Sequence, residues 1–242
     1  MRQVFKHIEE RSKQFDQRPL FLFLKNQDIS ARQRLEFIPW VSHFVMTFAD
    51  LYHFFLTEEP AQDRYQELVN QHLSEEGTHW KWFLSDLTAL GLDPNMRFTD
   101  AVRLLWSDAT VKTRLLAYRV CKLSGGMTSL EKLVLVHAIE ATGRVSLEAA
   151  VPVGNEVGRS LPRNLVYFGG HHLDTERQHT VEQDDVHESL MSIEIDEQTE
   201  RRMFQIVDEV FDSFADFVDE AFERASQRTP FSPQPRSATA TA

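Results

Sequence analysis

The sequence predicts an all-α helical bundle. Apolar residues recur at spacings of three and four along most of the chain, whereas alternating runs joined by Asn-Gly or Asp-Gly turns are nearly absent. A content of 42% hydrophobic residues, with 18 Phe and 4 Trp among 242 residues, is enough for a sizeable core. One domain is therefore expected over residues 1–228, followed by a disordered tail at 229–242 that is rich in Pro, Ser, Thr and Ala.

The helices expected in the first half of the chain are bounded by capping and breaking residues. Pro19 ends the first helix, Ser30 caps the second, and Gly91 suits the left-handed position that ends the third. A kink is expected at Pro39, within the second helix. The expected ranges are Gln3–Phe15, Ala31–Glu59, Ala61–Leu90, Thr99–Trp106 and Ala109–Leu123.

The second half of the chain predicts three more helices and one long loop. An apolar helix is expected over Ser129–Ala150. The segment Val151–Arg163 contains Pro and Gly, so we expect a loop with at most one helical turn, free to act as a lid. A helix from about Leu165 carries His171–His179, and the last helix, Asp196–Ser226, presents an apolar stripe of Phe and Val after a run of acidic residues.

Charge and cysteine content exclude several classes of function. The formal charge of −11 disfavours nucleic acid as a partner, because phosphate-backbone binders need a basic stripe. The single Cys121 forms no internal disulfide and no CxxC zinc site, which favours a reducing, cytoplasmic location. The apolar stretch Phe37–Leu56 contains His43, Asp50 and His53, which are costly at a bilayer centre. We expect it to be a buried helix, with no membrane partner.

The most informative pattern is a histidine–glutamate–histidine triplet that occurs twice. At about 100° per residue, offsets of four and seven place the second and third side chains about 40° and −20° from the first, so each triplet forms one helical face. Imidazole nitrogens with a carboxylate oxygen suit iron, zinc or manganese rather than calcium or magnesium. The two triplets are His72-x3-Glu76-x2-His79 and His172-x3-Glu176-x2-His179.

Two other segments are expected to complete a site inside the bundle. Glu140 lies on a helix of nearly all apolar or small residues, so its carboxylate must be paired, protonated or bound to metal. The Phe37–Leu56 helix offers His43, our first choice, and Asp50 on the same face, with Glu36 seven residues before His43. One triplet alone is typical of a solvated helix face. Two triplets together with Glu140 favour a dinuclear carboxylate site of the kind found in four-helix bundles.

The segment Tyr167–His179, together with Glu140 and Glu76-x2-His79, resembles the haem-oxygenase-like di-iron oxidases and oxygenases. The resemblance covers nearly the whole chain, to about Arg228. It implies a haem-oxygenase-like (TenA-like) bundle of about seven helices without haem, two iron ions, with manganese an alternative at one site, and O2 as co-substrate. Members of this family act on fatty acids, amino acids or arginine derivatives.

The resemblance also implies a set of metal ligands and two departures from the family pattern. The matched ligands are Glu76, His79, Glu140, His172, Glu176 and His179. The family's first-helix glutamate has no match, and its place falls near His43, so that His43 would replace it or Asp50 or Glu36 would serve instead. His72 is an additional imidazole where some relatives have a carboxylate. These departures indicate an altered metal preference or a single tight site.

The expected function is a non-haem di-iron oxidoreductase that oxidises a small amine, amino acid or fatty acid, with an external electron donor. Helical bundles of this kind often form homodimers, and the aromatic surface of the last helix is available for one. Two alternatives stay open: a non-catalytic metal- or ligand-binding protein of the same fold, and a haem-binding or haem-degrading protein. TenA-type thiaminases need a cysteine nucleophile in a context that Cys121 lacks, and haem oxygenases need a proximal histidine, for which His7 gives weak support.

Overall fold

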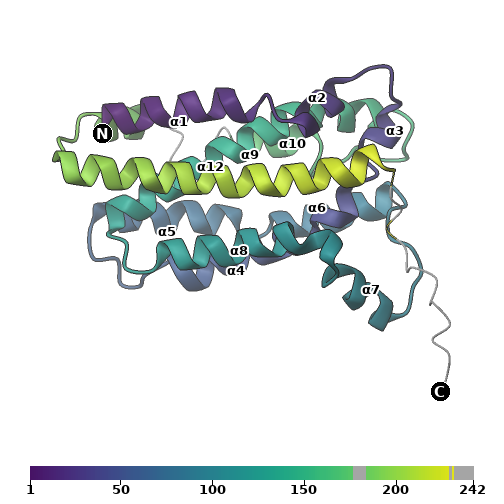
Figure 1. The fold of residues 1–242 in the computed structure, drawn as a ribbon, viewed down its shortest axis with the longest axis horizontal. Helices are drawn as coiled ribbons and strands as arrows, with labels where there is room; N and C mark the ends of the chain where they lie inside the picture. The colour runs from purple at the N-terminus through teal and green to yellow at the C-terminus, as the bar shows by residue number, and fades with distance from the viewer. Residues whose placement is uncertain (177–183, 229–230, 232–242) are drawn as a thin grey trace.

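The protein is a bundle of long helices wrapped around one central helix, α9 (Figure 1). The structure, a computed structural model, describes residues 1–176, 184–228 and 231. The central helix α9 (Ser129–Gly158) contacts α12, α5, α1, α2, α10 and α3. The remaining elements are α1 (Arg2–Phe15), α2 (Pro19–Lys25), α3 (Ala31–Arg34), η1 (Ile38–Val41), α4 (Ser42–Leu51), η2 (Tyr52–Leu56), α5 (Arg64–Glu76), α6 (His79–Ala89), α7 (Phe98–Leu105), η3 (Asp108–Thr110), α8 (Val111–Ser124), α10 (Gly170–Glu176), α11 (Asp184–Met191) and α12 (Glu197–Ser226).

The prediction of an all-α fold is confirmed. The described residues contain no strand, and α1, α7, α8 and α12 lie within about two residues of their expected ranges. Asp196 caps α12 by accepting a hydrogen bond from the Thr199 amide, as the sequence indicated for the start of this helix. The helix α11, which includes part of the acidic run before α12, was not expected.

The pairing of α1 with α12 explains part of the acidic composition. These helices lie side by side (Figure 1). Arg11 of α1 contacts Asp208 and Asp212 of α12, and His7 Nε2 lies 2.8 Å from Asp208 Oδ1. Arg119 of α8 contacts Asp216, one turn further along α12, at 2.7 Å. The carboxylates of α12 therefore connect it to its neighbours, whereas its apolar stripe faces the core.

The expected loop over Val151–Arg163 is wrong, because α9 continues to Gly158 with Pro152 inside it. Val151, Val153 and Val157 are buried, and this burial compensates for the hydrogen bond that Pro152 cannot make. A Cβ atom on Gly154 would lie 1.8 Å from the Phe168 carbonyl oxygen. Gly154 is thus present for close packing, and the helical segment to Gly158 is not a lid.

The expected third helix is broken between two of its candidate ligands. It forms α5, which ends at Glu76, and α6, which starts at His79, with Gly77 and Thr78 between them. Gly and Thr both have low helix propensity, and no side chain caps the start of α6. The candidate ligands Glu76 and His79 therefore belong to two helices rather than to one continuous face.

The expected second helix is also divided into shorter pieces. Ser30 caps α3 as predicted, and Pro39 lies in the 3-10 turn η1 before α4. The five residues Tyr52–Leu56 then form a π-helical turn, η2. Gln66 Nε2 donates to the Leu56 carbonyl at 2.8 Å, and Lys132 forms an ion pair with Glu58 beside it. These buried contacts stabilise the π-helical turn, a local structure that is common at functional sites.

Two expectations fall partly outside the described residues. The helix expected to carry His171–His179 is described as α10 to Glu176, and His179 lies outside the described part. The expected disordered tail at 229–242 also lies outside it, apart from Phe231. Among the described helices, none combines the length and apolar character needed to cross a membrane.

Candidate metal centre

Three buried side chains from two helices converge at the centre of the bundle. One donor atom each from His72, Glu76 and Glu140 lies within 4.8 Å of the other two. His72 Nε2 is 3.0 Å from Glu140 Oε1, and His72 is completely buried while the Glu140 side chain is 10% exposed. Buried imidazole and carboxylate groups at this spacing could hold a metal ion.

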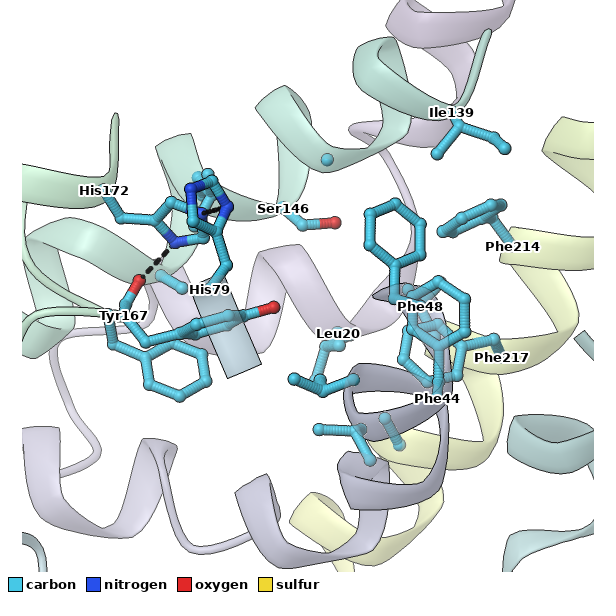
Figure 2. A pocket seen from close by; sticks show the side chains of 18 of the residues that line it. Leu20, Phe44, Phe48, His79, Ile139, Ser146, Tyr167, His172, Phe214 and Phe217 are labelled. Atoms are coloured by element: carbon cyan, nitrogen blue, oxygen red, sulfur yellow. Dashed lines mark hydrogen bonds between the residues drawn. The ribbon is translucent and has the colours of Figure 1, made fainter. Parts of the chain in front are cut away.

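A second pair of imidazoles extends this group toward α10. His79 Nδ1 lies 2.9 Å from Glu76 Oε2, and His172 Nε2 lies 3.2 Å from His79 Nδ1 (Figure 2). Trp82 stacks on the His79 ring, with centroids 4.3 Å apart and an interplanar angle of 21°. Five candidate ligands thus form one group, in which the donor atoms of neighbouring members lie within 4.8 Å of each other: His72, Glu76, His79, Glu140 and His172.

The segment before α10 orients the His172 ring. His172 Nδ1 lies 2.9 Å from the Tyr167 carbonyl oxygen, which can only accept, so Nδ1 donates the hydrogen bond. In the neutral imidazole, Nε2 then carries the lone pair and faces His79. A backbone carbonyl that fixes one nitrogen of a histidine ring is the usual way in which proteins orient a metal-binding imidazole.

Asp86, on α6, holds this segment in place. Its two carboxylate oxygens accept hydrogen bonds from the Val166 and Phe168 amides at 2.8 and 2.9 Å. Burial raises the pKa of Asp86, and the backbone hydrogen bonds oppose this rise. Asp86 therefore positions His172 indirectly, through the backbone around Tyr167. The sequence analysis missed it, although a lone carboxylate in the apolar part of a helix was an available signal.

Tyr52 is a second residue that the sequence analysis missed. Its hydroxyl donates a hydrogen bond to Glu140 Oε1 at 3.2 Å, and only 1% of Tyr52 is exposed. Tyr52 lies in the π-helical turn η2, which brings it beside His72 with ring centroids 6.0 Å apart. A single hydroxyl-bearing aromatic residue in a Phe-rich stretch was the signal that could have identified it.

The structure does not bring His43, Asp50 or Glu36 into this group, and the first choice of His43 is corrected. The His43 ring lies against Trp106 and Tyr118, with centroid distances of 5.4 and 6.4 Å. Burial, with a contribution from the charge of nearby Arg114, lowers the pKa of His43. Asp50 is exposed, and Glu36 lies before the turn η1.

The position of His43 has a simple geometric reason. Nine residues separate His43 from Tyr52, which at about 100° per residue corresponds to about 180° around a helix. His43 and Asp50 share a face, as expected, but that face points away from the bundle centre. Phe44 and Phe48 continue from Tyr52 along the inward face, with centroid distances of 5.2 Å between the two Phe rings and 4.3 Å between Phe48 and Tyr52. An apolar helix in which both faces look hydrophobic does not reveal this orientation in the sequence.

An apolar cavity of about 160 Å³ adjoins the cluster. Its lining includes Glu76, His79, Glu140 and His172. Figure 2 shows Phe44, Phe48, Phe214 and Phe217 together on the opposite side, with Ser146 and Tyr167 nearer to the histidines. A cluster of candidate ligands at the end of an apolar cavity is typical of a binding or active site.

The cluster fits a metal ion by its donor chemistry. It gathers two carboxylates and three imidazoles inside a largely apolar bundle, where buried charge is costly and a metal cation bound to the carboxylates would offset it. A ligand set of oxygen and nitrogen suits iron, manganese or zinc. The Glu176 side chain and His179, the remaining candidates, lie outside the described part of the structure.

The comparisons with known proteins support the fold. A crystal structure of a TenA homolog from Pseudomonas syringae pv. tomato matches this structure with a TM-score of 0.64 over 91% of each chain, at 12% sequence identity. No protein-family model matches the sequence. No curated protein matches it either. The chain therefore has the TenA-like, haem-oxygenase-type fold that the sequence predicted, and at 12% identity the match establishes the fold alone.

Proposed function

We propose that the protein is a non-haem dinuclear-iron oxidase or oxygenase that activates O2 to oxidise a small organic substrate. The observation that carries this proposal is the group of five neighbouring imidazole and carboxylate side chains, four of which line an apolar cavity. Glu76 lies between the other members of this group. One of its carboxylate oxygens is within 4.8 Å of donor atoms of His72 and Glu140, and Oε2 is 2.9 Å from His79 Nδ1. The proposed ligands are His72, Glu76, His79, Glu140 and His172, with Glu176 and His179 from the same triplet.

The protein's own groups would prepare the site for this chemistry. When bound, the iron ions supply the electrons that reduce O2. The Tyr52 hydroxyl, whose oxygen lies 3.2 Å from Glu140 Oε1, orients the Glu140 carboxylate by donating its proton to a hydrogen bond. The Tyr167 carbonyl fixes the ring of His172. The phenylalanines of the cavity exclude water, which protects a reactive oxidant from competing reactions.

Two other activities of this fold receive less support from the geometry. Cys121 does not line the cavity, and burial raises the pKa of its thiol, which disfavours a thiaminase-type nucleophile. His7 is bonded to Asp208 on the surface between α1 and α12, away from the cavity, so it does not offer an axial haem ligand there. The cavity is also far smaller than a haem requires.

A second candidate is a protein that binds one metal ion and catalyses no reaction. The donor atoms of His72, Glu76 and Glu140 converge closely enough for one ion, and this favours the candidate. The two functions differ in stoichiometry and in O2 consumption.

The test is metal analysis of the protein after anaerobic loading with Fe(II), followed by exposure to O2. We expect about two irons per chain in the wild type and a loss of iron in Glu140→Ala and His172→Ala. Glu148→Ala, on an exposed position of the same helix α9, and His171→Ala, on the exposed neighbour of His172, are the matched controls and should keep their iron. One iron per chain without O2 consumption would favour the binding protein, and no iron in the wild type would refute both.

A further inference from the structure

The cavity beside the cluster also limits the kind of molecule that can occupy it. We propose that it binds an uncharged organic molecule, with an apolar body of about six to eight carbons and a single hydroxyl or carbonyl group, and that Gly143 determines how large this body can be. As an assignment of substrate class, the inference rests on the proposed function. As a statement about binding, it can be tested without iron.

The charges around the cavity argue against a charged ligand. Among the described residues that line it, there is no Lys and no Arg. In the metal-free protein, a carboxylate in the cavity would therefore be buried without a cationic partner, which is costly. An ammonium group would compete with metal for Glu76 and Glu140, the two acidic residues of the lining. Amino acids carry both charges, so they are the least suitable of the substrates expected from the sequence.

The polar groups that remain are hydroxyls. Ser146 and Tyr167 lie between the histidines and the phenylalanine side of the cavity (Figure 2). The Ser146 hydroxyl donates to the Thr142 carbonyl at 2.8 Å, so its oxygen can accept a hydrogen bond from a ligand. Such a site suits one neutral polar group near the metal ligands, with the hydrocarbon part directed toward Phe44 and Phe214.

The size of the cavity sets the length of the hydrocarbon part. Its volume of about 160 Å³ is close to that of an engineered cavity of about 150 Å³ that stays dry and binds benzene. A short alkyl chain or a single aromatic ring fits this volume, whereas a long acyl chain does not. Phenylalanine rings form much of the wall and accept either kind of body.

Gly143 keeps part of this volume open. It lies on α9, one turn after Glu140, and lines the cavity. A Cβ atom added there would meet no atom within 4 Å, in contrast to Gly154, where a Cβ atom would collide with the Phe168 carbonyl. A glycine in a helix interior costs about 1 kcal/mol relative to alanine. Neither close packing nor a left-handed backbone requires Gly143, so its effect is to leave room beside Glu140.

The experiment is calorimetric titration of the full-length, metal-free protein with octan-1-ol, benzyl alcohol, octanoate, octylamine and arginine. We expect one of the two alcohols to bind at least about tenfold more tightly than the three charged compounds, a difference of about 1.4 kcal/mol. The two alcohols distinguish an alkyl body from an aromatic one. Octanoate, octylamine or arginine binding as tightly as the better alcohol would overturn the inference, as would the absence of binding by both alcohols.

The role of Gly143 is tested with three variants of α9. Gly143→Leu should fill the cavity and weaken alcohol binding at least about tenfold. Gly143→Ala should weaken it less and should keep or raise the melting temperature, which checks the case in which the leucine variant does not fold. Gly158→Ala is the matched control, because a Cβ there makes only ordinary contacts and does not line the cavity. Unchanged binding in a folded Gly143→Leu protein would refute the role.

These results separate the inference from the proposed function. Alcohol binding by metal-free protein that takes up no iron would support the inference and refute the oxygenase. Iron uptake with O2 consumption, but no binding of either alcohol, would support the oxygenase and refute the inference.

Discussion

Replacing Glu140 with glutamine is the most direct test of whether the cluster is a metal site or a structural hydrogen-bond network. The change keeps the size of the side chain and an oxygen that can accept from Tyr52, but it removes the charge. In metal-free protein it relieves the burial of two carboxylates whose donor atoms lie within 4.8 Å. We therefore expect Glu140→Gln to unfold at the same temperature as metal-free wild type or slightly higher.

The expected result reverses when Fe(II) is present. At a metal concentration 100 times the Kd, binding stabilises the wild type by about 2.7 kcal/mol. If the loss of one ligand weakens binding about 100-fold, the stabilisation of Glu140→Gln falls to about 0.4 kcal/mol. For a chain of this size the difference of about 2.3 kcal/mol corresponds to about 5–9 °C in the melting temperature.

The assay is thermal unfolding under anaerobic conditions, with and without Fe(II), for wild type, Glu140→Gln and the exposed control Glu148→Gln. The control should show the full wild-type shift. Two results would refute the reasoning. An equal Fe(II) shift in Glu140→Gln would exclude Glu140 as a ligand. A loss of more than about 2 kcal/mol in the metal-free variant would identify a structural network instead.

Three further variants test the surroundings of the cluster. Tyr52→Phe removes a hydrogen bond to Glu140 and should lower the free energy of unfolding by about 1 kcal/mol in urea titrations, and no change would contradict the bond. Asp86→Asn places an amide NH2 against a backbone N–H and should lower the free energy of unfolding by about 1–3 kcal/mol. Because the pKa of Asp86 is raised in the folded state, the difference in stability between wild type and variant should be largest below the ordinary pKa of 3.8 and should shrink as the pH rises through the raised pKa. The lowered pKa of His43 predicts that wild type loses stability as the pH falls below 6.5, and that His43→Gln loses less over the same range, with exposed His171→Gln as control. Equal pH profiles for wild type and His43→Gln would contradict the burial of a neutral imidazole.

The fold was largely predictable because helical periodicity and capping are local signals. Ser30 caps the helix that it was expected to cap, and Asp196, where the last helix was expected to start, is the N-cap of α12. The two main errors have different physical causes. Pro152 lies inside a helix because the residues around it are buried, whereas the break at Gly77 divides a segment whose periodicity looks continuous.

The candidate site was predictable where residue type and spacing carried the signal. Glu76, His79, Glu140 and His172 lie together, as the paired triplets and the buried carboxylate suggested. Their role as ligands stays a prediction. The contribution of the Phe37–Leu56 segment was not predictable, because the choice between its two apolar faces depends on how α4 packs against α8 and on the π-helical turn after it.

The break between α5 and α6 makes the geometry of the cluster depend on the angle between these two helices. Glu76 is the last residue of α5 and His79 is the first of α6, so the joint at Gly77 and Thr78 lies between two neighbouring candidate ligands. The angle between the two helices therefore sets the separation of these ligands. A metal ion coordinated by both side chains would fix this angle, and a rigid bundle would favour ions whose radius matches the separation of the two ligands.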